Sequence, residues 1–511
     1  MQSRRDWMSS FKSSAVPLFK LKVQEKGRIR DIKEIICRVQ GLPTCLNGQL
    51  VDLGDGVKGV IMGFDEEDVL VLVLGDSSRL RLGKEITGIS EPFRIPVGER
   101  FLGRMVTALG EPCDQAGEIV PDDHRPVFRD SPPIIHRAPV DEFLPTGTKI
   151  VDILVPLAKG QRLLILGDRM TGKTAIAVDT MLNQRDRNVV CIYCAVGKSL
   201  AAVEKVMSAM REGSALGYTV MVMATDASPV GEQYLAPFSA AAMGDYFASK
   251  GRDVLVVFDD LTKHAWAYRQ LSLLLERPPG REAYPGDIFY VQTQLMEQAG
   301  KFNRDRGGGS LTFLGIAETQ QGDLTGYIPS NLASMCDGQI CMSGTMFAEG
   351  FRPAVDIALS LSIIGGRAQP PLIKNLSKTL RADFARYTEV VKLSKLQSGL
   401  SGEAARIVRR GEAITSVLRQ GQYAPVSVEE EILLLYALHK GLLADLDEGQ
   451  RAVFRKEIRA FAAAKDSRTF ESLGAAAELS PELASRLDAI MEAFFAEHGW
   501  TAGGAEEPSG Q

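Results

Sequence analysis

The order of hydrophobic and polar residues changes twice along the chain, and each change predicts a new kind of domain. Between Gly27 and Val97, short apolar runs alternate with turn residues. The runs at 51–53 and 57–62 flank Gly54-Asp55-Gly56, a combination typical of a β-hairpin. Similar runs at 68–74 and 80–89 continue the series, and this spacing predicts a small β-barrel.

The middle of the chain has a different pattern. Residues 98–145 are rich in Pro, Asp and Gly and predict a linker that wraps onto the next domain. From about residue 146 to 370, apolar runs of strand length alternate with helical segments, which predicts an α/β domain with a mainly parallel sheet. The strand candidates are 162–166, 189–196, 219–224, 253–258 and 311–317. Cys191 and Cys194 lie on one of these strands with side chains on opposite faces, so we expect both to be core residues.

Helix signals dominate from about residue 375. Ser427 and Glu430 before an apolar run predict a capping box, and Ser480-Pro481 predicts the start of another helix. We therefore expect a short arm at 1–25, a β-barrel at 26–97, an α/β domain at 98–372, a helical domain at 373–500 and a disordered tail at 501–511.

Composition narrows the class of protein. The chain has 511 residues, of which 45% are hydrophobic and 24% charged, with a formal net charge of −5. The acidic balance argues against a nucleic-acid binder, which needs surplus Lys and Arg. The apolar runs are far shorter than the roughly 18 residues of a membrane span. No apolar stretch follows Arg4 and Arg5, which excludes a secretory signal peptide. We expect a soluble, cytoplasmic chain.

A phosphate-binding motif follows the first strand of the α/β domain. The segment spells the P-loop pattern G-x-x-x-x-G-K-[ST] with Gly167, Asp168, Arg169, Met170, Thr171, Gly172, Lys173 and Thr174. Its glycines let backbone N–H groups face a phosphate, and the helix that follows adds the positive end of its dipole. In this pattern Lys173 meets the β- and γ-phosphates, and the Thr174 hydroxyl binds Mg²⁺.

A second motif completes the nucleotide site. The apolar run 253–258 ends in Asp259 and Asp260, as in a Walker B strand. We expect Asp259 to hold Mg²⁺ or its water, and Asp260 to cap the following turn. These motifs predict nucleotide binding. Hydrolysis also needs a group that orients water and a positive charge near the transferring phosphoryl group.

Beyond these motifs, the chain resembles the α subunits of F-type ATP synthases over nearly its full length. The matching stretches are the P-loop and residues 258–265, 267–275, 277–287, 327–331, 337–340 and 420–423. The run Arg-Pro-Pro-Gly-Arg-Glu-Ala-Tyr-Pro-Gly-Asp at 277–287 is far more specific than a P-loop alone.

The resemblance implies an N-terminal β-barrel crown, a central RecA-like P-loop domain and a C-terminal helical bundle. It implies ATP and Mg²⁺ as ligands, and an α3β3 hexamer around a γ subunit, next to a peripheral stalk. In that family the α sites bind Mg-ATP without turning it over, and catalysis occurs on β. The complex couples ATP synthesis or hydrolysis to H⁺ or Na⁺ transport. The chain is then peripheral, on the cytoplasmic face of a bacterial or archaeal plasma membrane, and associates with the membrane only through the complex.

One position supports a non-catalytic site. After the strand that follows the P-loop, catalytic β subunits carry a Glu and α subunits usually a Gln, whereas this chain has Gly197-Lys198. A protonated lysine has no acceptor lone pair and does not serve as a general base. We expect Lys198 to be solvated at the start of a helix, with a phosphate contact as the alternative.

The resemblance also assigns the pocket for the base. Gln420 and Gln422 match the two glutamines that line it, and Phe347, Arg352 and Pro353 match residues near the base. A glutamine amide suits adenine because it both donates and accepts hydrogen bonds.

Three departures from the α pattern affect the prediction. Met170 replaces the usual P-loop Gln, although the backbone can still bind phosphate. Ile363 stands where α subunits carry an arginine finger, which is worth about 10³–10⁵ in rate, with Arg367 as a candidate substitute. The Arg/Lys/Ser-rich arm lacks the amphipathic helix that holds the δ subunit in ordinary α subunits. In this respect the chain resembles the α subunits of the alternate, N-type ATPases of some bacteria and archaea.

Three hypotheses stay open. The first is a regulatory, nucleotide-binding α subunit, of the N-type. The second is a degenerate α subunit that assembles without supporting catalysis, because Ile363 replaces the finger. The third is a self-sufficient RecA-like hexamer, such as a secretion ATPase or a helicase, which Gly197-Lys198 and the acidic balance disfavour.

Overall fold

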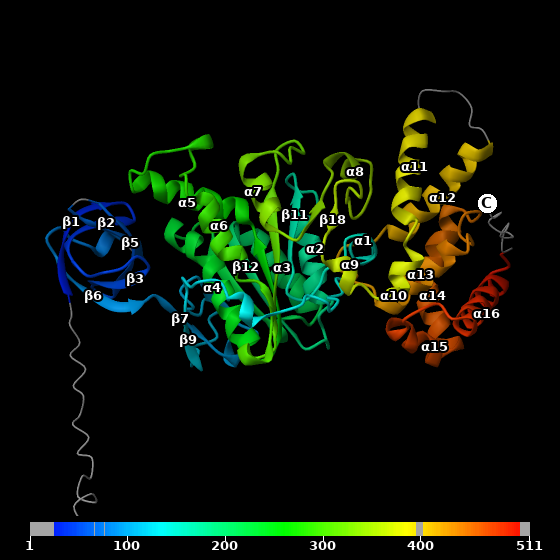
Figure 1. Ribbon diagram of the computed structural model, residues 1–511, viewed down its shortest axis with the longest axis horizontal. Coiled ribbons are helices and arrows are strands. Elements are labelled where there is room, and N and C mark those ends of the chain that lie inside the picture. Colours follow the sequence, from blue (N-terminus) through cyan, green and yellow to red (C-terminus); the bar gives the residue numbers. More distant parts are fainter. Residues whose placement is uncertain (1–24, 66, 76, 395–401, 501–511) are drawn as a thin grey trace, which may run out of the picture. The chain divides into compact units, whose positions relative to one another are not determined.

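The computed structural model describes residues 25–65, 67–75, 77–394 and 402–500. The predicted tail at 501–511 and the predicted arm at 1–25, apart from Glu25, lie outside the described residues. The chain forms two compact units, residues 1–93 and 94–511 (Figure 1).

The first unit is a closed β-barrel with the strand order β1-β2-β5-β4-β3-β6. The strands are β1 (Glu25–Lys33), β2 (Ile36–Gly41), β3 (Gln49–Gly54), β4 (Val57–Phe64), β5 (Val69–Leu74) and β6 (Glu85–Pro92). The predicted hairpin is confirmed, because β3 pairs with β4 in antiparallel register and Gly54 and Gly56 have φ of +78° and +77° at the turn. Residues expected at the end of the barrel instead form β7 (Arg94–Val97), which pairs with β9 (Asp123–Pro126) in the second unit.

The second unit contains a mainly parallel sheet, as predicted, in the order β18-β17-β11-β16-β14-β12-β13-β8. Its strands are β8 (Met105–Thr107), β11 (Arg162–Gly167), β12 (Val189–Lys198), β13 (Thr219–Thr225), β14 (Asp253–Asp259), β16 (Ser310–Glu318), β17 (Gly338–Cys341) and β18 (Leu361–Ser362), with β10 (Arg137–Ala138) and β15 (Gly300–Phe302) attached through β16. All the predicted strands are present. The segment predicted as a linker also contributes an edge strand, β8, which is too short to give a periodic signal.

Helices cover both faces of this sheet (Figure 1). Helices α2 (Lys173–Leu182) and α3 (Leu200–Glu212) share a core with one face, and α4 (Val230–Ser249) and α5 (Leu261–Leu274) contact the sheet outside that core. The remaining helices around the sheet are α1 (Lys149–Leu154), α6 (Ile288–Met296), α7 (Tyr327–Met335), α8 (Gly344–Ala348) and α9 (Gly365–Ala368). Cys191 and Cys194 are both buried and free, as expected.

The chain ends in a helical region that shares the core of α2 and α3. Its helices are α10 (Pro371–Leu376), α11 (Leu380–Ser394), α12 (Gly402–Leu418), α13 (Val428–His439), α14 (Glu448–Lys465), α15 (Ser467–Ser472) and α16 (Pro481–Glu497). Ser427 and Ser480 cap α13 and α16 with their side chains, which confirms the two predicted helix starts, but only the Ser427 half of the predicted capping box with Glu430 is present. The reciprocal capping box lies elsewhere, at the start of α14, where Asp447 and Gln450 bond to each other's backbone N–H groups.

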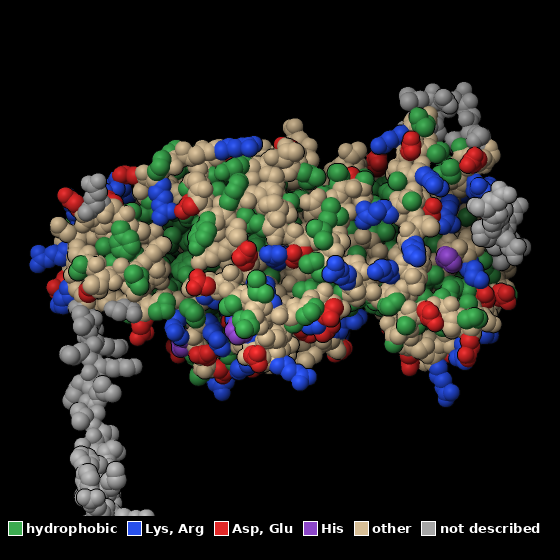
Figure 2. Space-filling model, in the orientation of Figure 1, with side chains coloured by type: hydrophobic (Ala, Val, Ile, Leu, Met, Phe, Trp, Pro, Cys, Tyr) green, Lys and Arg blue, Asp and Glu red, His purple; other side chains and the backbone are tan. Residues whose placement is uncertain are grey.

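Two further observations concern membrane-spanning helices and the distribution of surface charge. Among the described helices, none is both long and apolar enough to cross a membrane. On the face shown in Figure 2, basic and acidic side chains are intermixed.

Candidate nucleotide site

The predicted P-loop connects β11 to α2 and has the backbone that its glycines allow. Gly172 caps α2 in the left-handed region, with φ of +101°. A Cβ atom on Gly167 would lie 2.6 Å from Cβ of Met342. Glycine is therefore required at both positions, at Gly172 by backbone conformation and at Gly167 by close packing.

The P-loop lysine is folded back onto its own loop. Lys173 is buried, and its ammonium group donates hydrogen bonds to the carbonyl oxygens of Gly167 (2.7 Å) and Asp168 (2.6 Å). Burial lowers the pKa of Lys173. Because a phosphate oxygen is a stronger acceptor than a carbonyl, this ammonium group is well placed to exchange its partners for phosphate.

The other charged P-loop side chains bond to neighbouring loops and strands, and Met170 faces solvent. The Asp168 carboxylate accepts hydrogen bonds from the Thr319 hydroxyl (2.7 Å) and from the backbone N–H of Gly322 (2.9 Å). Arg169 pairs with Glu318 at 3.0 Å. Met170 has φ of +63° and is 90% exposed, so its side chain leaves the loop backbone accessible.

The two predicted metal ligands are in contact. The Thr174 hydroxyl donates to Oδ2 of Asp259 at 2.7 Å, and the Tyr193 hydroxyl donates to the same oxygen at 2.9 Å. Asp259 is completely buried at the end of β14. Because Mg²⁺ prefers hydroxyl and carboxylate oxygens, this pair fits the ion. The neighbouring Asp260 caps α5 through the Lys263 N–H (2.8 Å), as predicted, and burial raises its pKa to about 6.

The prediction of a solvated Lys198 is wrong. Its ammonium nitrogen lies 2.6 Å from Oδ1 of Asp259 and 3.6 Å from Oδ2 of Asp260, and its side chain is only 17% exposed. Although burial acts in the opposite direction, the two carboxylates raise its pKa, so it stays protonated. The correction has a physical cause, because two buried carboxylates need a nearby cation that the local sequence does not reveal.

A cavity of about 620 Å³ opens above these groups. Its basic lining residues are Arg169, Lys173, Lys198, Lys205 and Lys263, and its acidic ones are Asp226 and Glu318. The surplus of positive side chains beside a helix N-terminus suits a polyphosphate chain.

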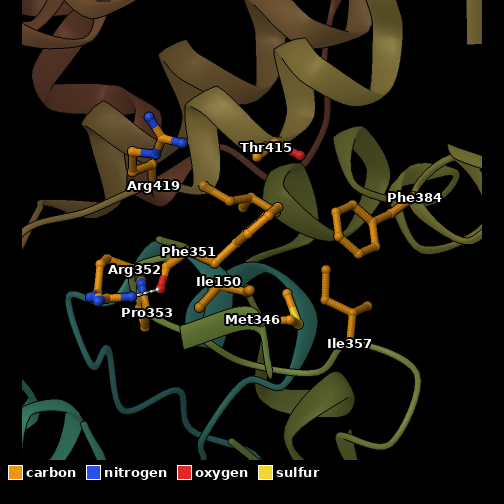
Figure 3. Close-up of a pocket in the computed structure, with 10 residues that line it drawn as sticks. Ile150, Met346, Phe351, Arg352, Pro353, Ile357, Phe384, Thr415 and Arg419 are labelled. Atoms are coloured by element: carbon orange, nitrogen blue, oxygen red, sulfur yellow. Dashed lines mark hydrogen bonds between the residues drawn. The ribbon is translucent and has the colours of Figure 1, made fainter. Parts of the chain in front are cut away.

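The residues predicted around the base line one cleft of about 30 Å³: Phe347, Arg352, Pro353, Gln420 and Gln422. The Arg352 guanidinium group lies 3.6 Å from the centroid of the Phe347 ring and donates to the carbonyl oxygens of Phe347 (2.6 Å) and Phe351 (2.8 Å). Figure 3 shows the bond to Phe351 at the edge of a neighbouring apolar hollow. That hollow measures only about 10 Å³, so we interpret it as a packing defect between α1 and the helical region.

Gln420 does not have the free amide that the sequence predicts. Its oxygen accepts from the backbone N–H of Lys149 (3.0 Å), and its nitrogen donates to the carbonyls of Gly147 (2.7 Å) and Ala424 (2.8 Å). The amide thus connects the loop after α12 to the start of α1. Gln420 lines the cleft, but both N–H donors of its amide are already used in hydrogen bonds to the backbone. Gln422 is exposed where it lines the same cleft.

The two residues linked to the missing arginine finger lie at the surface. Ile363 is 71% exposed just after β18, and its backbone N–H donates to the carbonyl of Asp337 at 2.9 Å. Arg367 is exposed in the single turn of α9. Within the described residues, neither contributes to the phosphate cavity or the base cleft.

Sequence reasoning missed two polar residues of the site. Tyr193 bonds to Asp259 from the adjacent strand β12, a contact that only the strand order reveals. Asp179 lines the base cleft from α2, and its Oδ1 is buried with no hydrogen-bond partner among the described residues. Burial raises the pKa of Asp179 to about 7. The sequence offered one signal for Asp179, namely a carboxyl group on an apolar helix face, six positions after the P-loop lysine.

Models of three protein domains match the chain in sequence order. The nucleotide-binding domain of the ATP synthase alpha/beta family matches residues 147–362. The C terminal domain of the ATP synthase alpha/beta chain matches residues 369–494. The beta-barrel domain of the ATP synthase alpha/beta family matches residues 22–88.

Proposed function

Because the chain belongs to the ATP synthase alpha/beta family, we propose that it is the non-catalytic, regulatory α subunit of an F-type rotary ATPase. In this proposal it alternates with β subunits around a γ subunit and a peripheral stalk holds the hexamer. The complex couples ATP synthesis or hydrolysis to H⁺ or Na⁺ translocation at a bacterial or archaeal plasma membrane, on its cytoplasmic face.

The ion pair between Lys198 and Asp259 is the observation that carries the non-catalytic assignment. Hydrolysis requires an acceptor that orients the attacking water. At the position in question the chain presents an ammonium group, which only donates. The nearby carboxylates are engaged, since Asp260 caps α5 and Glu318 pairs with Arg169.

The phosphate cavity and the base cleft together support nucleotide binding. The N–H groups of residues 167–174 and the Lys173 ammonium group hold the phosphates, and Phe347, Arg352, Pro353 and Gln422 contact the base. Thr174 and Asp259 are the residues that would hold Mg²⁺ where it accompanies the nucleotide, and Lys198 competes with the ion for Asp259.

The direct test uses the purified full-length chain. We expect it to bind ATP and to release no phosphate above the rate in buffer, measured by calorimetry and by a phosphate assay. Rapid turnover by the isolated chain would instead support a self-sufficient hexameric ATPase and contradict the non-catalytic site.

A degenerate α subunit is the second candidate, because Ile363 is exposed where the resemblance places a finger. In the reconstituted complex, Ile363→Arg then raises ATP hydrolysis by about 10³-fold or more. If the rate is unchanged and Arg367→Ala lowers it, Arg367 already supplies the charge. The N-type assignment has a separate test, namely neighbouring genes for a β subunit and a membrane ring without a δ gene.

A further inference from the structure

Behind two residues that line the phosphate cavity, Thr174 and Lys198, lie two consecutive buried carboxylates that share one ion-pair partner. Asp259 and Asp260 both have no exposed surface. Of the lysines that line the cavity, only Lys198 forms an ion pair with them among the described residues. Lys173 and Lys263 donate instead to backbone carbonyls, of Gly167 and Asp168 in one case and of Gly197 in the other. A buried carboxylate pair without this ammonium group would be strongly unfavourable.

The position of Lys198 is set by the backbone before it. Gly197 has φ of +59° at the end of β12, where the pairing with β13 shifts register between Val196 and Lys198. A Cβ on Gly197 would lie 3.0 Å from the Lys263 side chain. The backbone N–H of Asp226 donates to the Lys198 carbonyl at 3.0 Å. Lys198 is therefore held at both its backbone and its charged end.

This ammonium group competes for the oxygens that fit a metal. Oδ2 of Asp259 already accepts from Thr174 and Tyr193, and Oδ1 contacts Lys198. A divalent cation at Thr174 and Asp259 would lie within a few ångströms of the Lys198 ammonium group, beside a completely buried carboxylate. Like charges at such a distance repel strongly, because the effective dielectric constant is low.

We propose that Lys198 is a built-in counter-cation that lets this site bind nucleoside triphosphate largely without a divalent metal. The inference rests on the proposed function only in that the cavity must bind a nucleotide. The ammonium group takes over the charge neutralisation that Mg²⁺ supplies elsewhere, reaching the terminal phosphate while it remains beside Asp259. Binding of ATP at this site then depends weakly on Mg²⁺, and nucleotide stays bound in the presence of a chelator.

The test compares ATP affinity of the full-length chain in excess EDTA and in excess Mg²⁺ by calorimetry. We expect the two dissociation constants of the parent chain to agree within about threefold, and those of Lys198→Gln to differ by more than about 30-fold. Lys198→Arg keeps the charge and restores weak dependence on Mg²⁺. Lys205→Gln, in the same cavity without an ion pair to Asp259, is the matched control and shifts both constants by the same factor.

Mn²⁺ titration followed by electron paramagnetic resonance gives a second measurement that does not depend on activity. With ATP bound, the parent chain takes up Mn²⁺ more weakly than Lys198→Gln by about tenfold or more. A parent chain whose ATP affinity falls by more than about 30-fold in EDTA overturns this inference and leaves the proposed function intact. A parent chain that binds no ATP in either buffer overturns both. The parent measurement alone decides these outcomes, even if a variant fails to fold.

Discussion

The phosphate cavity forms one end of the site, the phosphate end, where charged side chains lie within ion-pair distance of one another. The base cleft forms the other end, the base end, which is lined by an aromatic ring, a proline and amides together with Arg352 and Asp179. The phosphate end has fixed charges before any ligand arrives, with Lys173 on the loop carbonyls and Lys198 on Asp259. At the base end, the amide of Gln420 and the guanidinium group of Arg352 are already bonded to the backbone.

This difference indicates how the two ends recognise a ligand. At the phosphate end, the groups that would bind the ligand exchange protein acceptors for phosphate oxygens. At the base end, Gln420 and Arg352 keep their protein partners, so contact with the base would be mostly through ring surfaces and the amide of Gln422. Polyphosphate alone should therefore detect one end, and the nucleoside the other.

The largest expected effect on ligand affinity comes from Lys173→Met at the phosphate end. The variant removes a charged donor with two short hydrogen bonds, so we expect ATP and tripolyphosphate to bind about 100-fold more weakly. Calorimetry with both ligands measures the change. Arg169→Met, whose side chain is 68% exposed, is the control and should cost far less affinity. Equal losses in the two variants would contradict the special role of the buried lysine.

The largest expected effect on stability depends on pH and comes from Asp179, which lies on α2 and lines the base cleft. Its pKa is about 7 in the folded chain against about 3.9 when unfolded, because the charged form is buried. The unfolded chain loses this proton as the pH rises above about 4, while the folded chain keeps it until about pH 7. The group's contribution to stability is therefore complete below pH 4 and is lost between pH 4 and 7.

Asp179→Asn removes this pH dependence. We expect the variant to gain roughly 4 kcal/mol over the parent chain at pH 8, relative to the difference at pH 4. Thermal denaturation across this pH range measures the change. Asp186→Asn, at a carboxylate whose side chain is 92% exposed, is the control and should follow the parent chain. A difference between Asp179→Asn and the parent that is independent of pH would contradict the raised pKa.

The base end is tested by Phe347→Ala. Stacking on an aromatic ring is worth about 1–3 kcal/mol per base, so we expect roughly tenfold weaker binding of ATP and unchanged binding of tripolyphosphate. Competition binding measures both ligands. Phe351→Ala, in the adjacent hollow, should lower the melting temperature without this split. If both ligands weaken together in Phe347→Ala, the two ends of the cleft are not separable.

The smallest effect separates the two glutamines. Gln422→Leu should change the ratio of ATP to GTP affinity by about threefold, the worth of one exposed hydrogen bond. Gln420→Leu should leave that ratio unchanged and lower the melting temperature, because Lys149 N–H and Gly147 C=O lose their partner. Competition binding and thermal denaturation check the pair. A changed ratio in Gln420→Leu would show that its amide does reach the base.

The two ends also differ in how well they could be predicted. The P-loop and the carboxylate after β14 follow from contiguous patterns, because local periodicity and glycine conformation are properties of neighbouring residues. The residues of the base cleft come from distant segments, and only the family resemblance brought them together. Even then the state of Gln420 was missed, since its partner Lys149 is 271 positions away.

The sequence by itself determined the barrel, the mainly parallel sheet, the helical C-terminal region and the phosphate loop. Each of these depends on the spacing of apolar residues or on a short motif. The tertiary structure decided which charges meet. Lys198 is polar and near a helix start, and only the parallel pairing of β12 with β14 places it beside Asp259. Ion pairs depend on distances between strands, and those distances are not encoded in the spacing of residues along one strand.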